Sequence, residues 1–304
     1  SAASDVYKRQ LLARPQGEEN LSGVVRAIIE RVREEGDAAL LDYTARFDKQ
    51  ALEASGLRVS DAELDAAEAQ TPKALREALK IAARRIEAFH MAQMPRDIEF
   101  TDDLGITAGM RWGALDAVGL YVPGGKAAYP SSVLMNAMPA KVAGVKRIAM
   151  VVPAPGGVLN PHVLAAANAA GITEIYRVGG AQAVAALAYG TASIARVDRI
   201  VGPGNAYVAE AKRQVFGAVG IDSIAGPSEV LILADASADP VQLAYDLLAQ
   251  AEHDEDAQSI LVTDDAELAA RVEREVARAL ESLPRRDIAA ASWARHGAII
   301  LVRD

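Results

Sequence analysis

The 304-residue sequence contains no cysteine, which excludes disulfide bonds, thiolate zinc sites, iron–sulfur clusters and a thiol nucleophile. It also lacks an excess of positive charge, because 32 Lys and Arg residues stand against 41 Asp and Glu residues, for a net charge of −9. This balance argues against a protein that binds nucleic-acid phosphates. No apolar run approaches the ~20 residues that a membrane-spanning helix needs, and no secretory signal is recognisable near the N-terminus. We therefore expect a cytoplasmic protein that binds neither nucleic acid nor membrane.

What is present is the composition of a globular protein, with 51% hydrophobic and 24% charged residues. Residues 20–95 carry apolar side chains at helical spacing, and Ser60-Asp-Ala-Glu63 has the pattern of a capping box. Short strands are expected over 98–120. From Val118 onward, β-branched strands alternate with helices, which is typical of parallel sheets covered on both faces. The predicted strands are 147–152, 174–178, 197–201, 230–234, 259–262 and 296–304, and the predicted helices are 162–170, 181–189, 206–216, 240–253 and 264–283.

The two ends of the chain look unlike those of a complete protein. Residues 1–16 are expected to be an unstructured or artificial lead-in, because their first ten residues show neither helical nor strand periodicity. The apolar run at 296–304 predicts a final strand, whereas a parallel strand normally leads into a crossover helix. The sequence therefore predicts a fragment cut within a βα unit; the alternative is a natural C-terminal strand.

Four turns are rich in glycine and polar residues: Tyr121-Val-Pro-Gly-Gly-Lys126, Val178–Gln182, Val201–Asn205 and Ala225–Glu229. Ligands of open parallel sheets bind beyond the carboxyl ends of strands, where glycine lets backbone N–H groups approach a phosphate. None of the turns is a complete G-x-G-x-x-G motif, since Tyr207 occupies the third glycine position after Gly202 and Gly204. Together the four turns favour a nucleotide or dinucleotide pocket.

Gln250 and His253 lie three residues apart near the end of a predicted amphipathic helix, so they project from one face. A carboxamide oxygen and an imidazole nitrogen are two possible ligands of a metal ion. The alternative is a helix C-terminus at which a cationic histidine interacts with the helix dipole. Spacing alone favours the alternative, because two ligands do not hold a metal.

A series of motifs resembles the histidinol dehydrogenase family, in order and with family-like spacing from Leu21 to Asp304. The motifs are Gly36–Asp48, Gly119–Gly125, Tyr129–Met135, Val178–Ala183, Gly202–Asn205, Ala225–Glu229 and Gln250–His253. The resemblance implies a zinc-dependent enzyme that oxidises L-histidinol to L-histidine through the aldehyde and reduces two NAD molecules. Without a cysteine, the aldehyde would be oxidised as its hydrate and not as a thiohemiacetal.

The resemblance also assigns residues. It implies that Tyr121, Gln182 and Asn205 contact NAD. Ser228 would bind the substrate, and Gln250 and His253 would bind one zinc ion per subunit and, through it, the substrate. It places an acid/base Glu-His pair and two further zinc ligands beyond Asp304, so no catalytic residue is assigned here. We therefore expect the 304-residue fragment to be inactive.

The fold implied by the resemblance is α/β, with two incomplete Rossmann-like parallel-sheet domains, one inserted in the other, and a helical N-terminal region. Residues 17–120 and 230–304 would form a discontinuous domain that carries the zinc-ligand helix, and residues 121–229 the inserted NAD-contacting domain. The family works as a homodimer.

Two alternatives to histidinol oxidation stay open. One is a paralogous zinc- and NAD-dependent alcohol dehydrogenase, for example a sulfopropanediol dehydrogenase. The other is a non-catalytic nucleotide-binding module that uses the glycine turns without metal chemistry.

Overall fold

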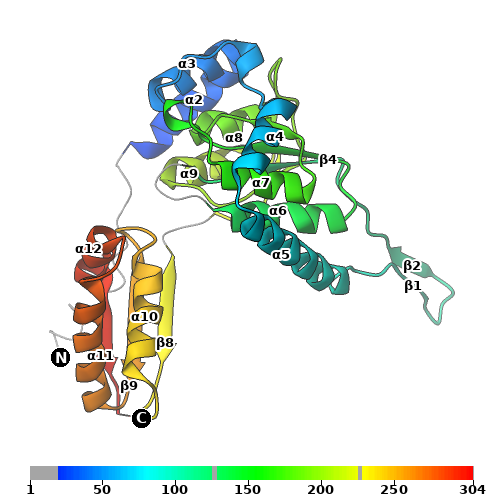
Figure 1. Ribbon diagram of the computed structural model, residues 1–304. Coiled ribbons are helices and arrows are strands. Elements are labelled where there is room, and N and C mark those ends of the chain that lie inside the picture. The colour runs from blue at the N-terminus through cyan, green and yellow to red at the C-terminus, as the bar shows by residue number, and fades with distance from the viewer. Residues whose placement is uncertain (1–19, 125–128, 225–227, 304) are drawn as a thin grey trace. The chain divides into compact units, whose positions relative to one another are not determined.

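The computed structural model describes residues 20–124, 129–224 and 228–303 (Figure 1). The predicted lead-in at 1–16 lies outside these residues. Packing divides the chain into two compact units, a larger one that ends at Ile224 and a smaller one that includes residues 228–303. None of the described helices combines the length and the apolar character that crossing a bilayer requires.

The larger unit alternates helices and strands as the sequence predicts from Val118 onward. Its described helices are α2 (Leu21–Glu35), α3 (Asp37–Phe47), η1 (Ala54–Gly56), α4 (Asp61–Gln70), α5 (Lys73–Ala92), α6 (Pro130–Val142), η2 (Pro155–Gly157), α7 (Pro161–Ala170), α8 (Gly180–Tyr189) and α9 (Ala206–Val215). Its described strands are β1 (Ile98–Thr101), β2 (Thr107–Met110), β3 (Ala117–Tyr121), β4 (Arg147–Val151), β5 (Glu174–Tyr176), β6 (Arg199–Val201) and β7 (Gly220–Ile221).

Five of these strands form a parallel sheet in the order β5-β4-β3-β6-β7. Side chains alternate along β3, so Val118 and Leu120 join one hydrophobic core while Ala117 and Tyr121 join the other. Helices α2, α3, α8 and α9 contribute to the core that contains Tyr121, and α4 to α7 to the opposite one. The sheet is therefore buried on both faces, which confirms the prediction of an α/β fold with covered parallel strands.

The edge of the sheet at β5 is covered by the segment that precedes α4. The amide of Val59 donates to the carbonyl of Ile175 (2.8 Å), and the amide of Arg177 donates to Leu57 (2.9 Å). Helix α4 then begins at Ser60, whose side chain forms the predicted capping box with Glu63. These contacts remove an open strand edge that would otherwise be free to pair with another chain.

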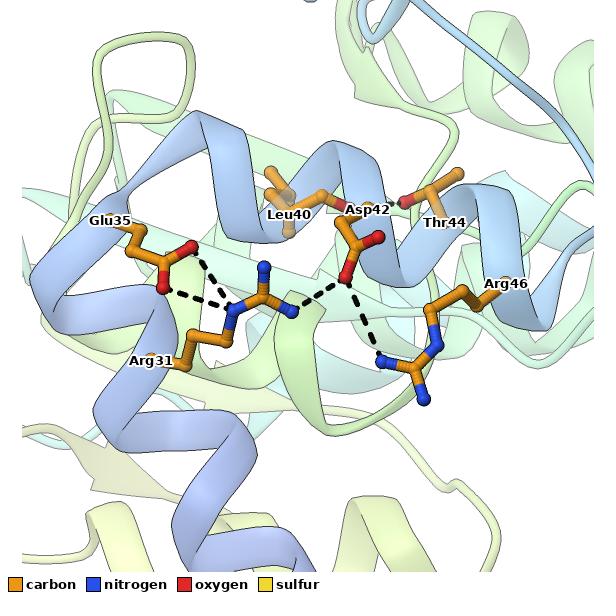
Figure 2. A network of polar contacts seen from close by, with 6 residues as sticks. All are labelled: Arg31, Glu35, Leu40, Asp42, Thr44 and Arg46. Carbon is orange, nitrogen blue, oxygen red and sulfur yellow. Dashed lines mark hydrogen bonds and ion pairs between the residues drawn. The ribbon is translucent and has the colours of Figure 1, made fainter.

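A polar network fastens α2 to α3 at the N-terminal end of the larger unit. Figure 2 shows the guanidinium of Arg31 between two carboxylates, with Nε 3.0 Å from Glu35 Oε2 and Nη1 2.5 Å from Asp42 Oδ2. Arg46 lies 3.7 Å from the same oxygen of Asp42. The hydrogen bond from Arg31 lowers the pKa of Asp42, so the carboxylate stays ionised at neutral pH. The network links the polar faces of the two helices, while their apolar residues contribute to one shared core.

The smaller unit contains a three-stranded parallel sheet in the order β10-β9-β8. Its described elements are β8 (Glu229–Leu233), α10 (Pro240–Ala251), β9 (Gln258–Thr263), α11 (Ala266–Leu280), α12 (Arg286–His296) and β10 (Ala298–Leu301). The three helices and the strands enclose a core of their own around Leu247, Leu261 and Val272. The opposite side of β8 carries exposed Leu231 and Leu233.

Three predicted boundaries need correction in this unit. Helix α10 ends at Ala251 and not at His253, and the predicted helix over 264–283 is α11 at 266–280. Helix α12 was not predicted. His296, which was predicted to begin the last strand, instead ends this helix. Only the small residues Ala289 and Ser292 of α12 are buried, so the segment lacks the apolar stripe that reveals a helix in a sequence.

The packing of residues 20–120 differs from the predicted division into domains. Residues 17–120 were predicted to form one domain with residues 230–304, whereas α2 to α5 pack here on the sheet that contains β3 to β7. The reason is hydrophobic: Val25, Ile28 and Leu40 share one core with side chains of that sheet and of α8.

Candidate functional site

The strand order of the larger sheet reverses at β3. From β3 the chain passes to β4 and β5 on one side, and then returns to β6 and β7 on the other. The loops that leave the carboxyl ends of β3 and β6 therefore diverge, which creates the crevice in which open α/β sheets bind ligands. Tyr121 is the last residue of β3, and Gly202–Asn205 directly follow β6. Two of the predicted glycine-rich turns thus flank this reversal.

Tyr121 is buried, and its hydroxyl accepts a hydrogen bond from the backbone N–H of Gly180 (3.0 Å). Burial raises the pKa of Tyr121 to about 12, so the phenol is protonated at neutral pH and stays so well into the alkaline range. Because one lone pair accepts from Gly180, the O–H is left to donate to a further partner. Gly180 begins α8, so the same bond brings the first turn of that helix to the end of β3.

Gln182 lies in this first turn of α8 and is almost completely buried. Its Oε1 has no hydrogen-bond partner among the described residues. A buried acceptor without a partner is uncommon and indicates either strain or the place of a donor that a ligand supplies. The prediction that Gln182 contacts a cofactor is therefore compatible with its surroundings.

Asp48 is a second buried acceptor at the same edge, and no role was predicted for it from the sequence. Its Oδ2 has no hydrogen-bond partner in the described part of the chain, and burial raises the pKa of its carboxyl group. Its backbone carbonyl accepts the N–H of Gly156 in the loop after β4 (2.7 Å), and its charge contributes to the raised pKa of Tyr121. The single signal in the sequence is its place at the end of the Gly36–Asp48 motif.

The loop after β6 lies directly against the end of β3. Gly202 has a φ of +114°, and a Cβ at this position would lie 2.1 Å from the carbonyl oxygen of Tyr121. Three residues later, the side chain of Asn205 accepts the N–H of Val208 (3.1 Å) and caps α9. Asn205 is exposed, so its amide group is open to a ligand at this end of the sheet. The structure thus brings the segments of Tyr121, Gln182 and Asn205 together.

Ser228, Gln250 and His253 belong to the smaller unit, at the amino ends of its strands. The carbonyl of Ser228 accepts the N–H of Gln258, the first residue of β9 (3.0 Å), and its side chain is exposed. Helix α10 runs antiparallel to the strands, so its last turn reaches the same edge. This edge differs from the carboxyl ends of strands, at which the glycine-rich turns were expected to bind ligands. Lys126 and residues 225–227 lie outside the described residues.

The last turn of α10 and the residues after it carry the two expected metal ligands, Gln250 and His253. The side chain of Gln250 is half-buried, with an Nε2 that has no hydrogen-bond partner in the described structure, while His253 is exposed. The backbone N–H of His253 donates to the carbonyl of Gln250 (3.2 Å), which keeps the two residues in one tight turn. A carboxamide oxygen and a neutral imidazole suit zinc, and they supply half of a tetrahedral set. Within residues 20–124, 129–224 and 228–303, no three His, Asp or Glu side chains gather as metal ligands.

Comparison with known proteins shows which family this chain is similar to. The protein-family model described as histidinol dehydrogenase matches residues 12–304. Histidinol dehydrogenase of Gluconobacter oxydans is 64% identical over 300 residues, which are 99% of this chain and 70% of that protein. The enzyme of Rhodospirillum rubrum is 64% identical over 294 residues, 97% of this chain and 68% of its own length.

A solved structure agrees with these sequence matches. The crystal structure of histidinol dehydrogenase from Elizabethkingia anophelis has a TM-score of 0.91 and 39% sequence identity to this chain. The match covers 97% of this chain and 68% of that one. This chain therefore spans about 70% of the length of the relatives that it matches.

Proposed function

Because this chain belongs to the histidinol dehydrogenase family of NAD-dependent oxidoreductases, we propose that its larger unit binds NAD at the strand-order reversal. The NAD contacts would come from Tyr121, Gln182 and Asn205. We propose further that the edge of the smaller unit that carries Ser228, Gln250 and His253 binds zinc and histidinol.

The observation that carries the NAD proposal is the set of unused polar groups around the end of β3. The Oε1 atom of Gln182 and the Oδ2 atom of Asp48 are buried acceptors without partners among the described residues. A dinucleotide carries amide and hydroxyl donors that match them, and bound NAD serves as the hydride acceptor. Tyr121 orients the first turn of α8, because its hydroxyl accepts a hydrogen bond from the N–H of Gly180.

In the smaller unit, Gln250 and His253 would each give zinc one ligand. When bound, zinc would orient histidinol, whose amino and imidazole nitrogens are suitable donors. Gln250 is placed by the last turn of α10, which is tied to β9 by the bond from Ser259 Oγ to the carbonyl of Leu247 (2.8 Å). His253 is placed by the turn that follows, where its backbone carbonyl accepts a hydrogen bond from the side chain of Arg285 (3.4 Å).

Three expectations from the family resemblance stay predictions. They are the homodimer, the cytoplasmic location, and the Glu-His pair with two further zinc ligands after residue 304. The expected inactivity of the 304-residue chain follows from the last of these. Formation of NADH by the purified chain from histidinol and NAD would contradict it.

Titration calorimetry with NAD tests the first part of the proposal. We expect the chain to bind NAD and Tyr121→Phe to weaken binding about fivefold, because one hydrogen bond is worth about 1 kcal/mol. Tyr189→Phe, at the far end of α8, is the matched control and should bind like the wild type. No heat of binding with the wild-type chain, or equal affinity for Tyr121→Phe, would argue against the proposed NAD contacts.

Zinc binding tests the second part. Equilibrium dialysis against zinc should show weak binding that His253→Ala and Gln250→Ala each reduce. His162→Ala, in the first turn of α7, removes a histidine outside the proposed site and should leave binding unchanged. Zinc retention that is the same in all four proteins would place the metal elsewhere.

A further inference from the structure

An ion pair holds the loop that follows β6. The ammonium group of Lys212, on α9, donates to the carbonyl oxygen of Gly202 (3.0 Å) and pairs with Asp222 Oδ1. The other carboxylate oxygen of Asp222 accepts the N–H of Gly202 (2.8 Å). The N–H and the carbonyl of Gly202 are therefore both hydrogen-bonded to this one ion pair.

The pair is itself fixed from two sides. Lys212 is buried, and burying an ammonium group is costly unless an opposite charge and hydrogen bonds compensate. Asp222, one-third exposed, follows β7, and its backbone N–H donates to the carbonyl of Ile200 in β6 (3.2 Å). The N–H of Ser223 donates to Asp222 Oδ1 (2.6 Å). The ion pair thus joins α9 and the ends of β6 and β7 to one glycine.

Gly202 is the point at which this loop touches β3. A methyl group there would lie 2.1 Å from the carbonyl oxygen of Tyr121, so the backbone of Gly202 packs directly on β3. The position of Gly202 therefore sets the position of the loop relative to Tyr121. Asn205 lies three residues further along and caps α9, the helix that also carries Lys212. The loop from Gly202 to Asn205 is therefore held at both ends by elements that the ion pair connects.

We propose that Lys212 and Asp222 are positioning residues of the dinucleotide site, which hold the 202–205 loop in its binding geometry before the ligand arrives. The inference rests on the NAD site proposed above and adds two residues to it. Lys212 is buried behind the loop and acts through Gly202, so its contribution to affinity comes from preorganisation. A loop that is ordered in advance loses less conformational entropy on binding.

The test separates this role from a purely structural one by measuring the Kd for NAD beside the melting temperature. Lys212→Met removes the ammonium and keeps an apolar stem, and Asp222→Asn keeps the acceptor for Gly202 while removing the charge. Arg147→Met is the matched control, since Arg147 forms an ion pair with Glu174 (2.6 Å) at the amino ends of strands in the same sheet. All four proteins are titrated with NAD well below their melting temperatures.

We expect Lys212→Met to weaken NAD binding about tenfold and Asp222→Asn about threefold, as for the loss of hydrogen bonds to charged groups. Arg147→Met should lower the melting temperature and leave the Kd unchanged. Hydrogen exchange should become faster at residues 200–206 in Lys212→Met. If that variant does not fold, the Kd and the exchange of Asp222→Asn decide.

Two results would overturn the inference in different ways. If the wild type binds NAD and both variants bind it equally well, Lys212 and Asp222 only stabilise the fold. If the wild-type chain does not bind NAD, the proposed site fails and the positioning role fails with it.

Discussion

Gly202 and Gly217 share an unusual backbone conformation, with φ values of +114° and +103°. They differ in their surroundings, because a Cβ at Gly202 would lie 2.1 Å from the Tyr121 carbonyl, while nothing lies within 4 Å of a Cβ at Gly217. A side chain at either position is strained by the backbone, but only the first one also meets another atom.

We therefore predict that Gly202→Ala destabilises the protein more than Gly217→Ala. Backbone strain costs about 1–3 kcal/mol in both variants, and the overlap with Tyr121 adds to it in Gly202→Ala. Urea denaturation of the two variants and the wild type measures the difference in unfolding free energy. Equal destabilisation would mean that the 202–205 loop moves away from β3 without cost.

Some residues of the proposed site could be predicted from the sequence and others could not. The glycine turns and the Gln250–His253 pair stand out in a sequence because their residue types are tied to particular chemistry. Asp48, Lys212 and Asp222 do not, because a sequence shows their charge and not their burial. Their surroundings come from other parts of the chain: Asp222 accepts from Gly202, twenty residues before it, and Asp48 accepts from Gly156, more than a hundred residues after it.

At the scale of elements, the N-terminus of α4 combines a local and a distant contact. Glu63 accepts the N–H of Ser60 (2.9 Å) within the capping box and accepts from Arg177, just beyond β5 (2.7 Å). The hydrogen bond from Arg177 lowers the pKa of Glu63 to about 2. The pair thus links α4 to the edge of the sheet.

Glu63→Gln should remove the charge from this link and leave the cap, because a glutamine oxygen still accepts from Ser60. Since the folded pKa lies below the unfolded value, the ionised pair stabilises the fold above about pH 4.5. This stabilisation is lost as the pH falls from there toward 2. The pair is partly exposed, so we expect a difference of about 0.5 kcal/mol at pH 7.

Urea denaturation at pH 7 and at successively lower pH measures this difference between wild type and Glu63→Gln. Glu77→Gln, at an exposed pair on α5, controls for the loss of one charge. A difference that grew as the pH fell would contradict the assigned sign.

Elements with strong periodicity were predicted well. The helices α7 to α9 and the strands β4 to β6 agree with the predicted segments to within a few residues, because buried parallel strands and amphipathic helices leave clear patterns. Helix α12 was missed for want of an apolar stripe. The pairing of residues 57–59 with β5 was not predicted either, since three residues carry no periodicity.

At the scale of the whole molecule, the hydrophobic cores of the larger unit share no residue with the core of the smaller unit. Leu40 belongs to a core of the larger unit, and Leu247 to the core of the smaller one. Both side chains are fully buried, so replacing either with alanine should cost about 2–5 kcal/mol.

We predict that calorimetry of the chain shows two unfolding transitions. Leu40→Ala should lower the temperature of one, and Leu247→Ala that of the other, because each substitution damages a separate core. A single transition that both variants shift alike would show that the two units unfold as one.

The order of elements along the chain has a consequence for synthesis. Helix α2 buries Val25, Ile28, Ile29 and Val32 against a core completed by α8 and α9, which begin at residues 180 and 206. A ribosome therefore releases the apolar stripe of α2 roughly 7–30 s before its partner α8 at ordinary rates of translation. During that interval the nascent chain offers the stripe to chaperones, and folding of the larger unit waits for its last strands.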